Sequence, residues 1–263
     1  MQKSYVWLIV LLVSAGIAGI LYYEMRQADM TVEQDTPATT TDSPGAPAIR
    51  HPVPGQEPSL GGEHSEEAPL PALDESDSVI QDALIRMIAS AQLQKLVVVQ
   101  NFIRRAVITI DNLPRATIPR KDIPLTAVTG RFVVNETGSL AIGADNYQRY
   151  NAYVELVESV NTDKLLSLYL HLYPLFQQAY QDLGYPEGYF NDRLIDVIDH
   201  LLATPEIAGP ILLVQPHVLY QYANPQIEGL SAGQKLLIRM GLDNARRVKT
   251  ELLKFRNGLL ART

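Results

Sequence analysis

The ten residues 191–200, NDRLIDVIDH, hold a dense group of side chains able to do chemistry. A helix places Asp192, Asp196 and His200 on one side, one turn apart. Carboxylates and an imidazole at this spacing can chelate a metal ion, and a carboxylate pair can transfer protons. The opposite side of the same helix is apolar, which is typical of an amphipathic helix whose charged side meets water. We therefore expect a solvated face, with no metal-binding and no catalytic residue assigned.

The loop before this helix, residues 184–190 or GYPEGYF, also has a composition that could bind a ligand. Three aromatic rings surround one carboxylate there, a combination that suits a sugar, a peptide or a cation. The alternative is an interhelical loop whose rings plug the edge of the core. The candidate contacts with a partner or ligand are Tyr185, Glu187, Tyr189, Asn191 and Asp192.

Other features limit the classes of enzyme. The chain has no cysteine, which excludes disulfides, thiol catalysis and zinc–thiolate sites. The phosphate loop, the dinucleotide fingerprint, the serine-hydrolase elbow and the zincin motif are also absent from the sequence. We predict no cofactor.

Residues 5–23, YVWLIVLLVSAGIAGILYY, follow a short tail of residues 1–4 and carry no charge. As a helix they span about 28 Å, close to the hydrocarbon thickness of a bilayer, and so predict a transmembrane anchor. Lys3 before the anchor and acidic residues after it favour a cytoplasmic N-terminus. Cleavage of residues 1–15 as a signal peptide is the alternative. Ala15 and Gly19 are small residues four apart, a spacing that lets two anchors pack as a homodimer.

The rest of the chain divides into a linker, a domain and a tail. Residues 24–71 contain 8 of the 17 prolines and few large apolar groups, which predicts a disordered acidic linker. Residues 72–258 have helical periodicity and length enough for a core, and residues 259–263 form a tail. The predicted fold is mainly α, with one small β-hairpin formed by residues 131–134 and 139–142.

Local signals place the helices within the domain. Capping boxes at Ser78 and Ser231 each predict a helix start. Pro174 predicts a kink or split, and Gly241 a weak point. The expected helices cover residues 79–88, 93–110, 144–160, 162–182, 191–203 and 232–257. Residues 209–225 give no decisive pattern.

The last part of the chain is basic. Residues 231–263 carry eight basic and two acidic side chains. Such a surface can contact nucleic acid or anionic lipid. Because these residues alternate with leucines and the domain is nearly neutral, we expect a solvated basic face that could dock the acidic linker or an acidic partner, and no nucleic acid.

Several longer motifs carry a resemblance. PLPALDESD, DNLPR, NYQRY, LYPLFQQAYQDLGYPEGYFNDRLIDVIDHLLATPE and GLSAGQKLLIRMG together resemble the bacterial domain of unknown function 3014 family, over about residues 70–255. The resemblance implies an N-terminal membrane anchor, a proline-rich spacer and a soluble domain in Gram-negative bacteria, hence a single-pass inner-membrane protein with a periplasmic domain. It supplies no catalytic residues.

Three functions are consistent with these features. The first is an interaction or scaffold module of the cell envelope that docks a protein or a cell-wall component. The second is an enzyme acting on a glycan or peptide, with Glu187 or Asp192 as acid or base in a tyrosine-lined groove. The third is a small-ligand sensor, which requires a deep and mostly apolar pocket.

Overall fold

The structure is a computed structural model and describes residues 48–54, 70–135 and 138–263. The predicted anchor, with Ala15 and Gly19, lies outside the described residues, as does most of the predicted linker. Within the described ranges, no helix is both long enough and apolar enough to cross a membrane.

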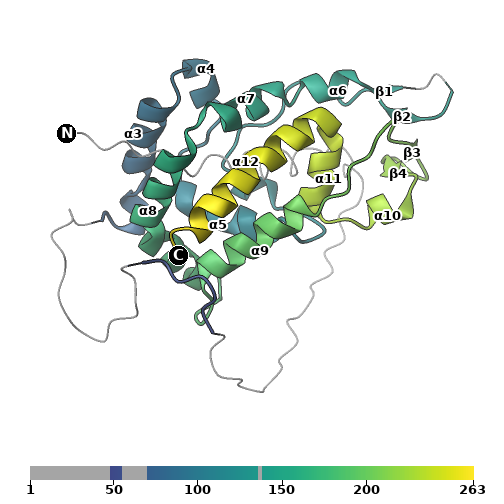
Figure 1. The fold of residues 1–263 in the computed structure, drawn as a ribbon. Helices are drawn as coiled ribbons and strands as arrows, with labels where there is room; N and C mark the ends of the chain where they lie inside the picture. The colour runs from purple at the N-terminus through teal and green to yellow at the C-terminus, as the bar shows by residue number, and fades with distance from the viewer. Residues whose placement is uncertain (1–47, 55–69, 136–137) are drawn as a thin grey trace.

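Helices dominate the described part of the chain (Figure 1). The α-helices are α3 (Asp77–Met87), α4 (Ala91–Gln94), α5 (Phe102–Asn112), α6 (Asp145–Gln148), α7 (Asn151–Ser159), α8 (Thr162–Asp182), α9 (Phe190–Leu202), α10 (Pro225–Glu228), α11 (Ala232–Arg239) and α12 (Leu242–Leu260). Short 3-10 helices are η1 (Leu73–Glu75) and η2 (Arg120–Asp122). The strands are β1 (Val134–Asn135), β2 (Ala141–Ile142), β3 (Leu213–Val214) and β4 (Gln221–Tyr222).

The long helix α8 forms the centre of the main core, packed against α5, α9 and α12. Its sequence is apolar on most sides, and Tyr169, Leu172 and Phe176 are buried. The expected split at Pro174 does not occur, since α8 continues through it. Burial of the neighbouring side chains outweighs the loss of one backbone hydrogen bond, because a buried side chain contributes about 1.5–3 kcal/mol.

Three of the expected helices are interrupted. Residues 95–101 separate α4 from α5, and Asn101 there has a left-handed backbone with φ of 51°. Asp77 of α3 accepts hydrogen bonds from the amides of Asn101 and Phe102, and so caps the start of α5 from a distance. A shorter break at Arg149 and Tyr150 divides α6 from α7.

The third interruption lies at Gly241, between α11 and α12. Its φ of 86° ends one helix and starts the next, a conformation that glycine adopts without steric cost. The predicted capping box of Ser231 and Gln234 at the start of α11 is confirmed. The one predicted at Ser78 is wrong: α3 begins at Asp77, and the Ser78 hydroxyl donates back to the Glu75 carbonyl.

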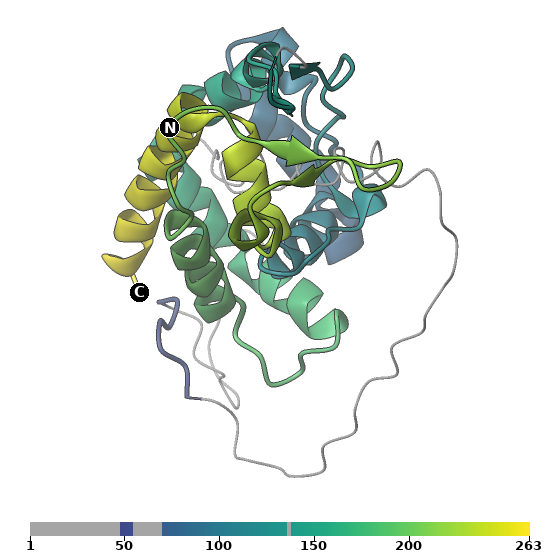
Figure 2. The ribbon, with the colours of Figure 1, turned by 90° about the vertical axis from the view of Figure 1, so that its right-hand side faces the viewer.

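Two antiparallel hairpins form a smaller second core. The hairpin of β1 and β2 was predicted, and that of β3 and β4 resolves the undecided residues 209–225. An isolated bridge between Ala141 and Leu212 joins the two hairpins. Figure 2 shows the second hairpin crossing the molecule beside α11. The small core contains Ile142, Ile211, Leu213, Tyr222, Ile227 and Ile238. A mainly helical domain with small hairpins is therefore confirmed.

Candidate functional site

The first candidate site is the start of α9, where residues 48–54 of the linker bind. We call residues 48–54 the docked segment (purple in Figure 1). The two Asp192 oxygens accept hydrogen bonds from the backbone amides of Arg50 and His51, both at 2.9 Å. The Asn191 amide donates to the His51 carbonyl at 2.8 Å. All three contacts join a side chain of α9 to the backbone of the docked segment, as in a peptide-binding site.

The docked segment also buries an apolar side chain. The Val53 amide donates to the Tyr189 hydroxyl at 2.8 Å, and the Val53 side chain belongs to the main core, 3% exposed. The Arg50 guanidinium reaches Asp196 one turn further along α9, at 2.7 Å. Main-chain pairing, apolar burial and an ion pair thus hold the segment together. These seven residues of the predicted linker therefore lie against the domain.

The solvated-face interpretation of α9 is therefore wrong for Asp192, and its neighbour Asn191 is buried too. Asn191 is fully buried and does not cap the helix, because Tyr189 occupies that position. It also accepts a hydrogen bond from Tyr169 at 3.0 Å. Asp192 is only 9% exposed. Solvation was correctly expected for the half-exposed side chains of Asp196 and Asp199.

Partners from other elements satisfy the remaining charges on α9. Arg193 pairs with the buried Asp111 of α5 at 2.9 Å. Asp199 pairs with Arg256 of α12. Within the described ranges, no three acidic or histidine side chains are placed to hold a metal ion.

His200, at the far end of this face of α9, contacts Ser231 at the start of α11. Its Nε2 lies 2.8 Å from the Ser231 hydroxyl, which accepts a hydrogen bond from the Gln234 amide. The hydroxyl proton can therefore point to Nε2, and this arrangement suits a neutral imidazole. Burial, and secondarily the charge of Arg193, lowers the pKa of His200.

Tyr185 and Glu187, the other two predicted contact residues, lie in different surroundings. The Tyr185 hydroxyl donates to Asp111 at 3.2 Å and accepts from Arg115 at 2.8 Å, so it braces α5. The Tyr185 ring stacks on Tyr180 at 4.6 Å between centroids. Glu187 is exposed. The loop thus closes the core edge, the alternative anticipated from its composition.

Ion pairs within the domain also account for much of the basic face of α12. Arg246 pairs with Glu206 at 2.7 Å and Arg247 with Glu158 at 2.6 Å. Arg262 pairs with Asp163 at 2.9 Å. The Arg247 guanidinium lowers the pKa of Glu158. These carboxylates neutralise the charges that the sequence suggested for an acidic linker or partner.

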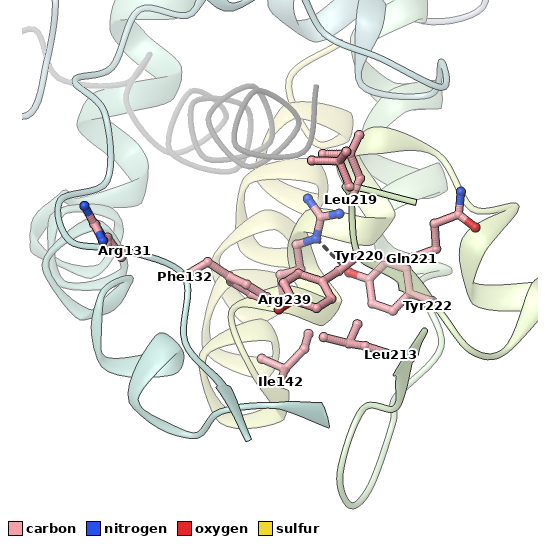
Figure 3. A pocket seen from close by; sticks show the side chains of 10 residues that line it. Arg131, Phe132, Ile142, Leu213, Leu219, Tyr220, Gln221, Tyr222 and Arg239 are labelled. Carbon is pink, nitrogen blue, oxygen red and sulfur yellow. Dashed lines mark hydrogen bonds between the residues drawn. The ribbon is translucent and has the colours of Figure 1, made fainter. Parts of the chain in front are cut away.

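The second candidate site is a pocket of about 300 Å³ beside the small core (Figure 3). Phe132 before β1, Ile142 of β2 and Leu213 of β3 supply apolar walls. Tyr220 and Tyr222 add aromatic rings, with Phe132 and Tyr220 6.1 Å apart between centroids. Such a volume is at the lower end of small-molecule pockets, roughly 300–1,000 Å³.

Two arginines border this pocket. The Arg239 Nε donates to the Tyr222 hydroxyl at 2.9 Å, and its guanidinium carbon lies 5.5 Å from the centre of the Tyr222 ring (Figure 3). Burial raises the pKa of Tyr222 although Arg239 opposes the rise, so the phenol is neutral at physiological pH. Arg131 is exposed at the border.

Sequence reasoning missed both features. Arg50 and Val53 stand 142 and 136 residues before their partners Asp192 and Tyr189, and no local pattern reports such a distance. The pocket draws its walls from segments around residues 132, 142, 213–222 and 239. Its one visible signal was the short apolar run 211–214 in an undecided region.

Comparisons with known proteins identify a family without an assigned activity. A search of curated proteins and a search of solved structures returned no match. The family described as protein of unknown function (DUF3014) matches residues 102–256, which include α5, α8, α9, most of α12 and the whole pocket. The resemblance drawn from the sequence motifs is thereby confirmed, and the chain belongs to the DUF3014 family.

Proposed function

We propose that this chain is a single-pass protein of the bacterial inner membrane whose periplasmic domain is a binding module. The support for the anchor is the uncharged stretch of residues 5–23 with Lys3 on one side and acidic residues on the other. The partner is a protein or a cell-wall component of the envelope. Packing of two anchors through Ala15 and Gly19 is part of the same proposal.

The docked segment supports a short working distance from the membrane. Its contacts with Asp192 and Tyr189 leave residues 24–47 as the connection to the anchor. These 24 residues are half of the 48 in the whole predicted linker, which shortens the reach of the domain from the membrane. The module therefore meets components close to the bilayer surface.

The observation that carries a binding function is the pocket beside the small core. It combines apolar walls with a few polar groups, as ligand sites do. The same observation favours a small-ligand sensor as a second candidate function. A glycan- or peptide-acting enzyme has less support: Glu187 is exposed on a loop, and Asp192 is held by two backbone amides.

The location can be tested with single cysteines, since the chain has none of its own. A cysteine at the exposed position Glu187 should react with a membrane-impermeant maleimide in cells with a permeabilised outer membrane. A cysteine at Lys3 should react only after lysis. Equal protection of both positions, or the reverse pattern, would contradict a periplasmic domain.

Docking can be tested by photo-crosslinking in the same cells. A photoreactive residue replaces Val218, which is 66% exposed at the pocket. A control replaces Leu253 of α12, which is 47% exposed and outside the pocket. We expect a discrete protein adduct from position 218 alone. Adducts of equal yield from both positions, or from neither, would contradict docking of a protein at this surface.

A further inference from the structure

The lining of the pocket has an unusual charge balance. Ten residues form it: Arg131, Phe132, Ile142, Leu213, Val218, Leu219, Tyr220, Gln221, Tyr222 and Arg239. Two are arginines, and none is acidic. A neutral apolar ligand gains nothing from the guanidinium groups, whereas an anionic group pairs with them through charge-assisted hydrogen bonds.

The two arginines differ in burial and in their hydrogen bonds. Arg239 is half-buried and oriented by its hydrogen bond to Tyr222, so its guanidinium is held in place before a ligand arrives. Arg131 is exposed, and it makes no hydrogen bond or ion pair with any residue in the described ranges. Figure 3 shows the two side chains on opposite sides of the pocket, with Phe132 between them, so Arg239 is the cation that an anionic head group inside the pocket can meet.

The size and walls of the pocket define the rest of the ligand. At about 30 Å³ for each water-sized group, a volume of about 300 Å³ holds about ten such groups. Ile142, Leu213 and Phe132 offer them no strong hydrogen-bonding partner. One short hydrocarbon chain fits this space, whereas the two long chains of a bilayer lipid do not.

We infer that the pocket binds a single-chain amphiphile, with a hydrocarbon chain of about ten carbons inside and an anionic group at Arg239. This inference names the ligand class of the pocket and rests on the binding function proposed above. The hydrocarbon chain gains from removal of apolar surface from water. The head group gains from the Arg239 guanidinium.

The test uses the full chain in nanodiscs of zwitterionic phosphatidylcholine. A decanoate analogue carrying a diazirine is photoactivated, and the labelled peptides are mapped by mass spectrometry. Unlabelled decanoate and decanol then compete with the probe. We expect labels on the pocket segments and about tenfold stronger competition by decanoate than by decanol, as for one charge-assisted hydrogen bond.

Two matched variants isolate the charge at the pocket. Val218→Glu places a carboxylate at an exposed position, and Val218→Gln is its neutral control of similar shape. We expect V218E to weaken decanoate competition about tenfold while decanol is unchanged, and V218Q to retain the preference for decanoate. Arg239→Gln should reduce that preference, whereas Arg246→Gln, away from the pocket, should not.

Each outcome tests a different part of the inference. Pocket labelling with equal competition by decanoate and decanol overturns the anionic ligand but leaves a binding pocket. No competable labelling of the pocket overturns this inference, and the crosslinking at Val218 in cells still tests protein docking separately. Labelling lost only when anionic phosphatidylglycerol enters the nanodiscs assigns the site to a bilayer head group and also overturns a single-chain ligand.

Discussion

Asp192 shows that the environment of a residue cannot be inferred from its own helix alone. Its position in an amphipathic helix predicts solvation, yet two backbone amides of the docked segment share its carboxylate. The sequence pattern reports only neighbours along α9, and Arg50 is 142 residues away. The apolar side of α9 was predictable, because periodicity within one helix is enough to define it.

Replacing Asp192 tests the docked segment at this scale. Asp192→Asn keeps the shape but removes the charge and one acceptor, so we expect the free energy of unfolding to fall by about 1–3 kcal/mol. Urea denaturation measures it. Asp196→Asn breaks a half-exposed ion pair in the same helix and should cost at most about 1 kcal/mol. Equal losses in the two variants would contradict a special role for the main-chain contacts.

His200 gives the fold a pH dependence. Because its folded-state pKa is lowered by burial and by Arg193, the unfolded chain binds the proton more readily. Stability therefore rises with pH between the folded pKa and the ordinary value of about 6.5, and it is lost as pH falls below that value. The urea midpoint at about pH 5 and about pH 7.5 measures this difference. His200→Gln should reduce it, and an unchanged difference would assign the effect to other groups.

At the scale of elements, local signals succeeded where the partner was local. The Ser231 capping box and the first hairpin depend on residues a few positions apart. The start of α5 escaped prediction because its cap is Asp77, on another helix. Gly241 was expected to weaken one helix, whereas its positive φ separates two.

Two glycines distinguish backbone strain from crowding. A Cβ on Gly241 would lie 2.8 Å from the Tyr147 ring, whereas at Gly184, also at positive φ, it would meet nothing within 4 Å. We expect Gly184→Ala to cost about 1–2 kcal/mol, and Gly241→Ala about 1–3 kcal/mol more from the clash. Thermal unfolding of both variants measures the costs. Similar losses would show that α12 moves away from Tyr147 at little cost.

At the scale of the whole molecule, two candidate sites occupy different parts of the domain. The docked segment lies against the main helical core through Val53. The pocket belongs to the small core between the hairpins and α11. Composition predicted a helical domain and a linker, but not which part of the linker binds or that the hairpins enclose a pocket, because both depend on contacts between distant segments.

Replacing residues 49–53 by glycine and serine in the full chain tests the arrangement as a unit. We expect a loss of unfolding free energy of about 2 kcal/mol or more, as for a lost apolar side chain with its hydrogen bonds. The same replacement at residues 40–44 is the control. Adding Asp192→Asn to the first replacement should cost little more, since loss of the Val53 and Arg50 side chains already releases the segment from Asp192. Full additivity of the two losses would contradict a shared site.

The docked segment also determines where mechanical force enters the domain. Tension from the N-terminus reaches the hydrogen bonds at Asp192 and Tyr189 before it reaches α3, because residues 50–53 precede that helix in the chain. Rupture there would release the seven residues 48–54 from the domain, which add roughly 25 Å at full extension. The contact thus acts as a breakable link, and its failure would give the domain slack before any helix is pulled open.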